Sequence, residues 1–476
     1  MERLNFLRLP EGGKKNIYEE AGVPGAVLDS SMRQAQQLWL DMYLNRPFWK
    51  KTVYADGMSG LSSAGEIYGL NLPAIMTEEL ARLVVGEEVR LHMEGRGRAR
   101  FLQEFMERSV LPALRRQVAY CAALGGVVFK PYLDANNTLQ MSFVLPESFL
   151  PLDFDNAGVT GAVMTSSRRQ GRYTYTRLEI HRMLPNHKYL VQNRLFRSDG
   201  TRSAHEEVPL SEVADYAGLC REAVLENIKR PLFVYFKMPN ANHIDPQSPL
   251  GVSIYSSCVD VMRQVDITFD ALINEIELGE RRIFIGDSMV KLRRDKEGNP
   301  IASFNKRDRV FRQLQFDGGR EGVIHDAPSL RVADLRLALQ TQLDLATSAL
   351  GFTQGSFSFD DRRGSMTATQ VLSENSKLFR TMRDVENALQ SALEQTLEVA
   401  EIFADLYGLA PKGWYGSRFV FEARLPENKN QLTSRGIEKV AAGLMSPLRF
   451  LIEVEGMSEA AAKKELAILR GAGGGQ

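Results

Sequence analysis

The chain has 476 residues, of which 44% are hydrophobic and 25% charged, and its 59 basic side chains are matched by 59 acidic ones. These proportions are those of a folded protein with two or more structural units, and they exclude bulk disorder. Without a basic excess, any contact with nucleic acid should be local or weak. The only cysteines, Cys121, Cys220 and Cys258, are too few and too far apart for a disulfide framework or a zinc site.

The N-terminal stretch MERLNFLRLPEGG lacks the apolar run and the small-residue cleavage site of a secretion signal. The longest uncharged apolar stretch, residues 119–129, is well short of the roughly 20 residues that span a bilayer. We therefore expect a soluble intracellular protein that makes no membrane contact.

Apolar residues at spacings of three and four predict helices over residues 28–44, 77–91 and 98–124. The last helix should bend or break at Val110, because a proline follows two residues later. After Gly125 the period changes to short β-rich runs separated by turn signals, as far as about residue 196. This pattern predicts an antiparallel sheet packed on the preceding helices.

The second half of the chain alternates long helices with shorter segments. A helix over 254–278 is followed by strands and turns in 281–328, a helix over 329–350 and a flexible loop. Two helices with a β segment at one end and a loop at the other should form a pillar. The remaining expected elements are a helix from Met366 to about Tyr407, started by a Thr367–Gln370 capping box and ended by Gly408, a strand over 417–425 and a helical module over 430–470.

Charge is separated along this expected pillar. Residues 254–280 contain six acids and one base, whereas residues 281–328 contain eleven bases and seven acids. One interpretation is that both segments simply have ordinary solvated faces. The other is functional: an acidic shaft would repel phosphates, and a basic tip could bind an acidic partner.

Motifs for catalysis are absent from the sequence. It contains no GxxxxGK[ST], GxGxxG, HExxH, GxSxG or CxxC pattern, and its six histidines are scattered. The adjacent pair Asp360–Asp361 resembles a metal-binding carboxylate pair, but no third ligand is evident. We therefore expect no enzyme, no metal and no cofactor. The alternative hypothesis is a metal-dependent nuclease or phosphotransferase built around this pair.

The loop between the second and third long helices, GFTQGSFSFDDRRGSMTATQV at 351–371, is too apolar for a solvated linker and too glycine-rich for a core element. Together with SENSK just after it, and with SPLGVSIYSSCVDVMRQVDITFDALINEIELGERRIFI at 248–285, this segment resembles the portal proteins of tailed bacteriophages, particularly long-tailed phages. The segments LGGVVFKPYLD and FVLPESFLPLDFD, within 124–155, are similar to the sheet of the family's outer domain. The resemblance covers about residues 20–425.

The resemblance implies an α+β portal fold with named parts. These are a wing over 1–253, stem helices over 254–280 and 329–350, a clip over 281–328, a tunnel loop over 351–366, a long helix with a returning wing strand over 367–428, and a helical crown over 429–476.

The resemblance also implies a function without catalysis. Portal proteins form rings, usually of about twelve subunits, at one capsid vertex, through which double-stranded DNA is packaged and ejected. The implied partners are the terminase large subunit, which supplies the ATPase, a head–tail adaptor, and the major capsid and scaffolding proteins. The implied location is the virion, and the host cytoplasm during assembly. A third hypothesis is a different structural protein of the head, such as an adaptor or scaffold.

Three groups of site residues follow from the same resemblance. The loop phenylalanines would pack against neighbouring subunits or narrow the channel, and its arginines would touch DNA phosphates weakly. Alternatively, the phenylalanines are buried at a subunit contact and the arginines pair with Asp360 and Asp361. The groups are the tunnel-loop residues Phe352, Gln354, Phe357, Phe359, Arg362 and Arg363, the channel-lining acids Asp260, Asp266, Asp270 and Glu277, and the partner-binding clip residues Arg293, Arg294, Lys306, Arg307 and Arg309.

Overall fold

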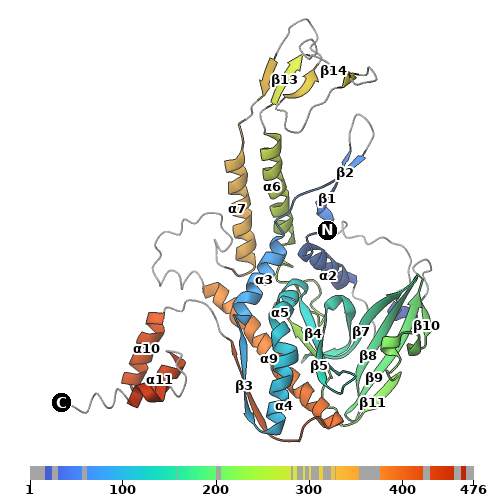
Figure 1. Ribbon diagram of the computed structural model, residues 1–476, viewed down its shortest axis with the longest axis vertical. Coiled ribbons are helices and arrows are strands. Elements are labelled where there is room, and N and C mark those ends of the chain that lie inside the picture. The colour runs from blue at the N-terminus through green and yellow to red at the C-terminus, as the bar shows by residue number, and fades with distance from the viewer. Residues whose placement is uncertain are drawn as a thin grey trace, which may run out of the picture.

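The fold is α+β, with a body of helices and sheets, a two-helix pillar, a strand group at the tip of the pillar and a small helical module near the C-terminus (Figure 1). The predicted fold class is confirmed. The computed structural model describes residues 17–23, 30–55, 62–156, 158–199, 205–279, 282–286, 293–294, 300–301, 310–314, 323–326, 329–352, 376–421, 429–454 and 462–467.

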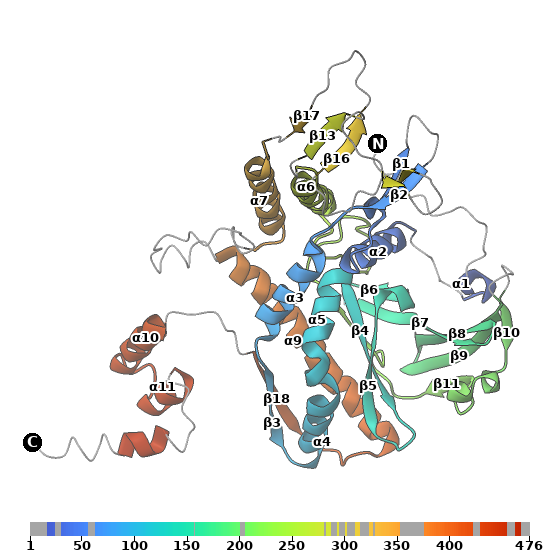
Figure 2. The same ribbon diagram turned by 45° about the horizontal axis from the view of Figure 1, so that its top comes forward.

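The helices of the body lie together beside the sheets (Figure 2). The segment predicted as one helix over 98–124 is interrupted, as expected: a π turn over Met106–Val110 and a 3-10 turn over Leu111–Ala113 separate two α-helices. Pro112 lacks an amide hydrogen, so a regular helix cannot pass through it. The body helices are α2 (Ser30–Tyr43), α3 (Leu72–Val85), α4 (Gly97–Phe105), α5 (Leu114–Leu124) and α9 (Ser376–Tyr407).

The helix predicted over 77–91 is wrong at its C-terminal end. Helix α3 stops at Val85, because Gly86 has a φ of 66°, a conformation that favours glycine. Residues 89–95 instead form strand β3 (Val89–Gly95), which pairs antiparallel with β18 (Tyr415–Phe421). Buried Val89 and Leu91 alternate with an exposed residue, which is the period of a strand.

The predicted antiparallel sheet is present as two separate sheets. The smaller has the order β12-β4-β5 and packs on α5 and α9, and the larger has the order β10-β9-β8-β7-β6 with β11 also paired to β9. Their strands are β4 (Gly126–Leu133), β5 (Leu139–Val144), β6 (Phe149–Asp155), β7 (Gly158–Gln170), β8 (Tyr173–Leu184), β9 (Lys188–Ser198), β10 (Glu206–Val208), β11 (Glu222–Leu225) and β12 (Val234–Lys237).

A buried charged network joins these two sheets. Glu179 on β8 accepts hydrogen bonds from Lys130 of β4 (2.5 Å), Arg177 (2.6 Å) and His181 (3.0 Å). The Tyr189 hydroxyl accepts from a backbone amide and lies 3.0 Å from His181 Nδ1. Because an ionised carboxylate can only accept, the bond to Glu179 uses an Nε2 hydrogen, and in a neutral imidazole Nδ1 then accepts from the Tyr189 hydroxyl. Burial opposes ionisation, but the surrounding cations, Lys130 first, hold the pKa of Glu179 well below its ordinary value.

The main core draws on both ends of the described chain. Trp39 of α2, Phe129 of β4, Leu389 of α9 and Phe419 of β18 belong to one buried cluster. Buried Arg98 of α4 reinforces this closure, since it donates hydrogen bonds to the carbonyl oxygens of residues 401 and 411 and to the carboxylate of residue 405. The body is therefore complete only when the C-terminal part of α9 and the strand β18 are in place.

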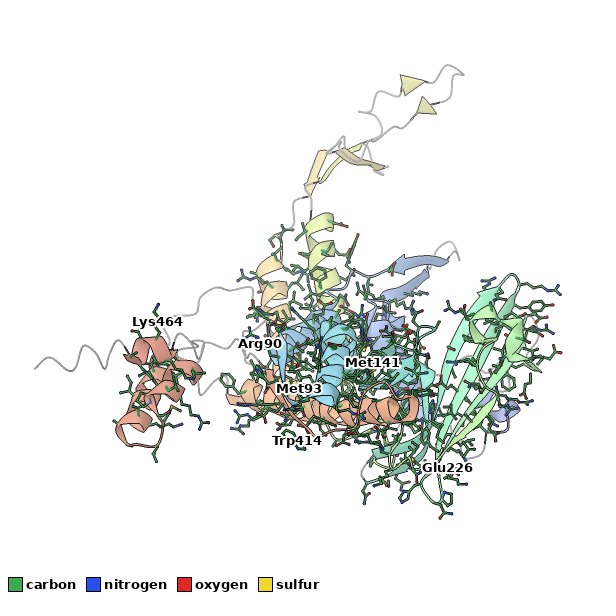
Figure 3. All side chains as sticks on the ribbon, turned by 60° about the horizontal axis from the view of Figure 1, so that its bottom comes forward. Arg90, Met93, Met141, Glu226, Trp414 and Lys464 are labelled. Carbon is green, nitrogen blue, oxygen red and sulfur yellow. The ribbon has the colours of Figure 1, made fainter. Side chains whose placement is uncertain are left out.

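Smaller elements lie around the body. Helix α1 (Ile17–Glu20) packs on the larger sheet, and a hairpin of β1 (Lys51–Ala55) and β2 (Ser62–Glu66) rises beside the pillar (Figures 1 and 2). Helices α10 (Lys429–Ala441) and α11 (Pro447–Glu453) form the predicted C-terminal helical module, apart from the body in Figure 3. Gly408 ends α9 with a φ of 62°, as predicted. The Thr367–Gln370 capping box lies outside the described residues.

Candidate functional site

The pillar consists of α6 (Val259–Leu278) and α7 (Val332–Ala349), which lie side by side and run in opposite directions (Figure 1). Helix α6 starts five residues later than predicted. Ile254 donates its amide hydrogen to the Ala122 carbonyl, and the Tyr255 hydroxyl donates to the Trp39 carbonyl, so this stretch is fixed as a buried turn. These contacts with distant residues override the local helical pattern.

An ion pair ties the two helices together near the tip. Glu275 of α6 accepts from the Arg331 backbone amide (3.0 Å) and guanidinium (2.8 Å). Arg331 is the N-cap of α7, where a carboxylate is favoured by the helix dipole. The hydrogen bonds from Arg331 lower the pKa of Glu275, so the pair is ionised at neutral pH.

A short segment before α3 crosses the base of α6 and is held there by two carboxylates. Asp266 accepts hydrogen bonds from Trp49 Nε1 (3.0 Å) and from the Leu70 amide (3.2 Å), and Asp270 accepts from the Tyr68 amide (2.9 Å). Burial raises the pKa of Asp266, although its hydrogen bond to Trp49 opposes that shift. We call the residues from Ile67 to Leu70 the strap.

The four predicted channel-lining acids thus lie in different surroundings. Asp266 is only 7% exposed, so the expectation that it lies on an open acidic face is wrong: it is an internal acceptor that binds Trp49 and the strap. Asp270 is half-buried and shared between the strap and Asn274. Asp260 and Glu277 are exposed, and for them the channel role stays a prediction.

Of the predicted tunnel-loop residues, the structure describes only Phe352. It is 3% exposed, belongs to the main core of its own chain and donates its amide hydrogen to the Thr347 carbonyl. It therefore anchors the end of α7 and is not exposed for a neighbouring subunit or DNA. The other five, Gln354, Phe357, Phe359, Arg362 and Arg363, lie outside the described residues, as do Asp360 and Asp361.

The described residues on either side of that loop contact each other. Lys377 of α9 donates to the Ser348 carbonyl of α7 at 2.6 Å. Gly351 has a φ of 81° and faces Thr381, whose side chain leaves no room for a Cβ atom there. The chain therefore enters and leaves the predicted loop at one place, the base of the pillar.

At the tip of the pillar, the described strands form two small sheets. β13 (Arg282–Gly286) lies between β16 (Val310–Leu314) and β17 (Val323–Asp326), and β14 (Arg293–Arg294) pairs with β15 (Pro300–Ile301). Two of the predicted partner-binding residues, Arg293 and Arg294, are thus the strand β14. The remaining three, Lys306, Arg307 and Arg309, lie outside the described residues.

The pillar has exposed apolar side chains on opposite sides. Ile267 is 39% and Ile276 is 53% exposed, and a separation of nine residues on one helix places them about 180° apart. On α7, Leu337 and Leu345 are 69% and 57% exposed and lie on one stripe. A two-helix pillar cannot cover its own outer faces, so these side chains remain in solvent in a single chain.

The part of the chain that the structure describes contains neither a metal-binding cluster nor a membrane-spanning helix. None of its His, Cys, Asp and Glu side chains form a group of three or more that could hold a metal ion. Among the described helices, none is both long and apolar enough to cross a bilayer.

The family of the chain is decided by comparison with protein-family models. Residues 40–466 match the model described as "Phage portal protein, SPP1 Gp6-like". The chain belongs to this family of portal proteins. It therefore has the role of a portal, the connector between the head and the tail of a particle.

Comparisons of this portal protein with individual proteins add little. A search of curated proteins found no match. Chains of three solved structures are similar at 10% identity, covering 80% of this chain and 89% of theirs. They come from the virion of a native gene transfer agent (GTA) particle (TM-score 0.39), the neck of the native GTA particle computed with C12 symmetry (0.36) and the neck of the empty GTA particle computed with C6 symmetry (0.35).

Two features of the portal protein's pillar were missed from the sequence. The strap and its bond to Asp266 join residues about 200 positions apart, and no local pattern signals them. The flanking residues give no signal either, because Asp260 also lies between two apolar residues, Val259 and Val261, and is exposed. The exposed leucines of α7 were visible in the sequence but fitted a buried stripe equally well.

Proposed function

We propose that this portal protein assembles into a closed ring of about twelve copies at one capsid vertex. The ring would serve as the conduit for packaging and ejecting double-stranded DNA, without catalysis of its own. It would also dock the terminase large subunit, a head–tail adaptor, and the major capsid and scaffolding proteins. Its location would be the virion, preceded by the host cytoplasm during assembly.

The parts of the chain take their proposed roles from their order. Residues 1–253 would be the wing and 254–280 and 329–350 the stem, with the clip in 281–328. The tunnel loop would be 351–366, followed by the long helix and returning strand in 367–428 and the crown in 429–476.

The exposed apolar residues on opposite sides of the pillar carry this proposal. A two-fold dimer uses the same patch on both copies, whereas a ring needs two different patches, one for each neighbour. Ile267 and Ile276 lie on opposite sides of α6, so a pillar between two neighbours could cover both. Burying a leucine fully contributes about 1.5–3 kcal/mol, which makes Leu337 and Leu345 strong candidates for this interface.

The channel wall would then be formed by the remaining exposed acids. Asp260 and Glu277 are available to repel DNA phosphates, so that the duplex slides without adhering. Asp266 would contribute instead by fixing α6 to Trp49 and the strap through hydrogen bonds. The channel wall would therefore have fewer exposed carboxylates than the number of acidic residues in α6 indicates.

The test is the oligomeric state of purified protein with charge placed in the proposed interface. We expect rings of the wild type by native mass spectrometry and negative-stain imaging. Leu337→Asp and Leu345→Asp should raise the concentration for half-assembly at least tenfold, since 1.4 kcal/mol corresponds to a factor of ten. Phe154→Asp is the control, because Phe154 is also an exposed apolar residue (50%, against 57% for Leu345) but lies on the distant strand β6.

A wild-type protein that remains monomeric or dimeric across concentration and salt would refute the ring. If rings form but both leucine variants assemble like the wild type and the Phe154 variant, the ring would stand and this interface would be wrong.

A further inference from the structure

The larger sheet lies at the side of the body away from the pillar (Figure 1), and its edge is interrupted between β10 and β11; we call this interruption the notch. One edge of β9 is paired with β8 throughout. Its other edge is divided between β10, which pairs with Leu195–Arg197, and β11, which pairs with Tyr189–Gln192. A cavity of about 560 Å³ opens at this division. Its volume is in the range of known ligand pockets, roughly 300–1,000 Å³.

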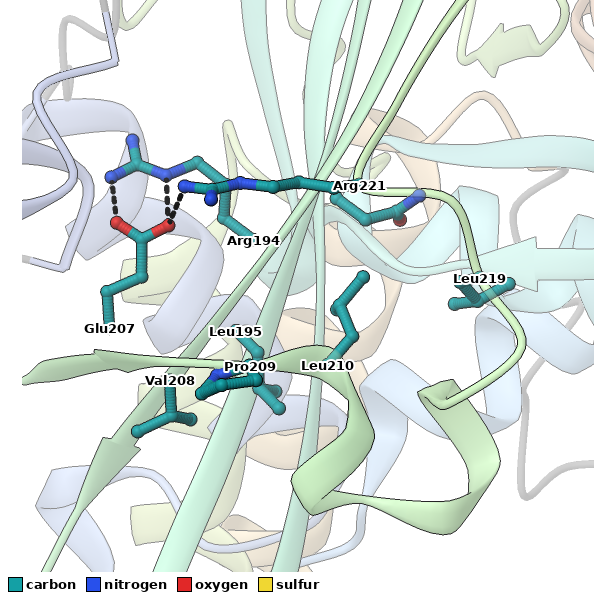
Figure 4. A pocket seen from close by; sticks show the side chains of 9 residues that line it. Arg194, Leu195, Glu207, Val208, Pro209, Leu210, Leu219 and Arg221 are labelled. Carbon is teal, nitrogen blue, oxygen red and sulfur yellow. Dashed lines mark hydrogen bonds and ion pairs between the residues drawn. The ribbon is translucent and has the colours of Figure 1, made fainter.

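The polar wall of this notch has two guanidinium groups and one carboxylate (Figure 4). Arg194 binds both oxygens of Glu207, at 3.2 and 2.6 Å, and also donates to the Ala21 carbonyl. Arg221 donates to Glu207 at 3.1 Å. The hydrogen bond from Arg194 is the main cause that lowers the pKa of Glu207, so the carboxylate stays ionised at neutral pH. The group therefore has one net positive charge.

That positive charge is accessible through Arg221. Its side chain is 76% exposed, whereas the Arg194 side chain is 21% exposed and donates hydrogen bonds to Glu207 and Ala21. Glu222, the next residue in the chain, turns away and accepts a hydrogen bond from Gln192. A planar guanidinium is well suited to bind an incoming carboxylate through two parallel hydrogen bonds.

The opposite wall of the notch is apolar. Leu195 and Val208 belong to a small buried cluster, and Leu210 packs against it. Leu219 is 38% exposed and lies at another side of the opening (Figure 4). An apolar wall of this kind can bind an aliphatic side chain, and it offers nothing to a phosphate backbone.

We infer that this notch binds a peptide segment of a partner protein in which an acidic residue stands next to a leucine-like residue. The carboxylate would pair with Arg221, and the aliphatic side chain would lie between Leu210 and Leu219. A basic segment would be repelled by the net positive charge. The phosphates of DNA would be repelled by Glu207 and would find no hydrogen-bond donor among the leucines. The inference rests on the proposed function in one respect: it gives the chemistry by which the wing would dock a head protein.

The experiment measures binding of labelled peptides to the full-length protein by fluorescence anisotropy. The probe is a short peptide of alternating Asp and Leu, compared with Asn–Leu, Asp–Ser and Lys–Leu peptides of equal length. We expect the Asp–Leu peptide to bind tightest, since it alone has both features. Arg221→Ala should weaken it about two- to fivefold, the usual range for one exposed ion pair. Arg221→Glu should reverse the preference toward the Lys–Leu peptide.

Arg100→Glu is the matched control, because Arg100 is also exposed and paired with one carboxylate, Glu104, but lies on α4. It should leave peptide binding unchanged. Equal binding by the wild type and the Arg221→Glu variant would overturn the inference. So would equal binding of the Asp–Ser peptide, or displacement of the Asp–Leu peptide by a DNA duplex at physiological salt.

Ring formation is measured on the same samples, so that the two proposals can fail separately. Rings of normal size that do not bind the Asp–Leu peptide would overturn the peptide site and leave the ring intact. A protein that binds the Asp–Leu peptide but forms no rings would overturn the ring and leave the peptide site intact.

Discussion

The buried carboxylate of Glu179 provides a direct test of what joins the two sheets of the body. Glu179 lies between Lys130 on one sheet and Arg177 on the other, and all three side chains are nearly buried. In Glu179→Gln the size is kept, but both cations lose their counter-charge. Removing one partner of a buried ion pair costs about 3–5 kcal/mol, because the other charge is left without compensation.

The expected result is a fall in the unfolding temperature on the order of 3–5 °C, measured by calorimetry at pH 7, since the unfolding entropy of a chain of this length is about 1 kcal/mol per degree. Glu206→Gln is the control, because Glu206 pairs with Arg197 in the same sheet but is mostly exposed. Exposed ion pairs contribute little to stability, so this variant should unfold nearly as the wild type does.

The same network predicts a pH dependence with a definite sign. The pKa of Glu179 in the folded protein is well below the ordinary value of 4.5, so the folded state favours its ionised form. Its contribution is therefore complete above about pH 4.5 and is lost as the pH falls through the folded value. The difference between wild type and Glu179→Gln should be constant above that pH and shrink below it. A Glu179→Gln protein as stable as the wild type at pH 7 would refute the reasoning.

Three further outcomes are expected. Asp266→Ala should leave the donors of Trp49 and the strap without an acceptor, which costs about 1–3 kcal/mol of stability for each and should speed amide hydrogen exchange in the strap. Unchanged exchange would contradict the role of Asp266 in holding the strap. Replacing Arg362 and Arg363 together with alanine should leave rings intact and reduce DNA packaging in an infection assay, whereas normal packaging would remove the case for a loop–phosphate contact. Plasmid DNA incubated with the protein and Mg²⁺ or Mn²⁺ should stay uncut; cleavage that Asp361→Ala abolishes would support the nuclease alternative.

The fold was predictable from the sequence where the apolar periodicity agrees with residues that interrupt or end a helix. The interruption before α5 follows from Pro112, and the end of α9 follows from Gly408. The error over residues 77–91 has a physical reason. Val89 and Leu91 fit a helix and a strand equally well, and the choice is made by pairing with β18, more than 320 residues away.

The candidate site was predictable only in outline. The two pillar helices and the portal family were predicted from the sequence, yet the surroundings of individual residues depended on contacts between distant segments. Asp266 and Asp260 look alike in the sequence, but Trp49 and the strap bury the first and leave the second exposed. Phe352 is a similar case, since its place in the main core at the end of α7 depends on contacts with distant segments.

The pairing of β3 with β18 sets the order in which a newly made chain can fold. Gly95 of β3 pairs with Tyr415 of β18, which is synthesised 320 residues later. At about 5–20 residues per second, the ribosome needs roughly 15–60 s to synthesise the chain between them. During that interval the apolar sides of α6 and α7 emerge while the body that supports them is unfinished. Truncated chains would therefore expose the apolar residues of the pillar without a folded body, so the proposed ring would depend on complete translation as much as on the proposed interface.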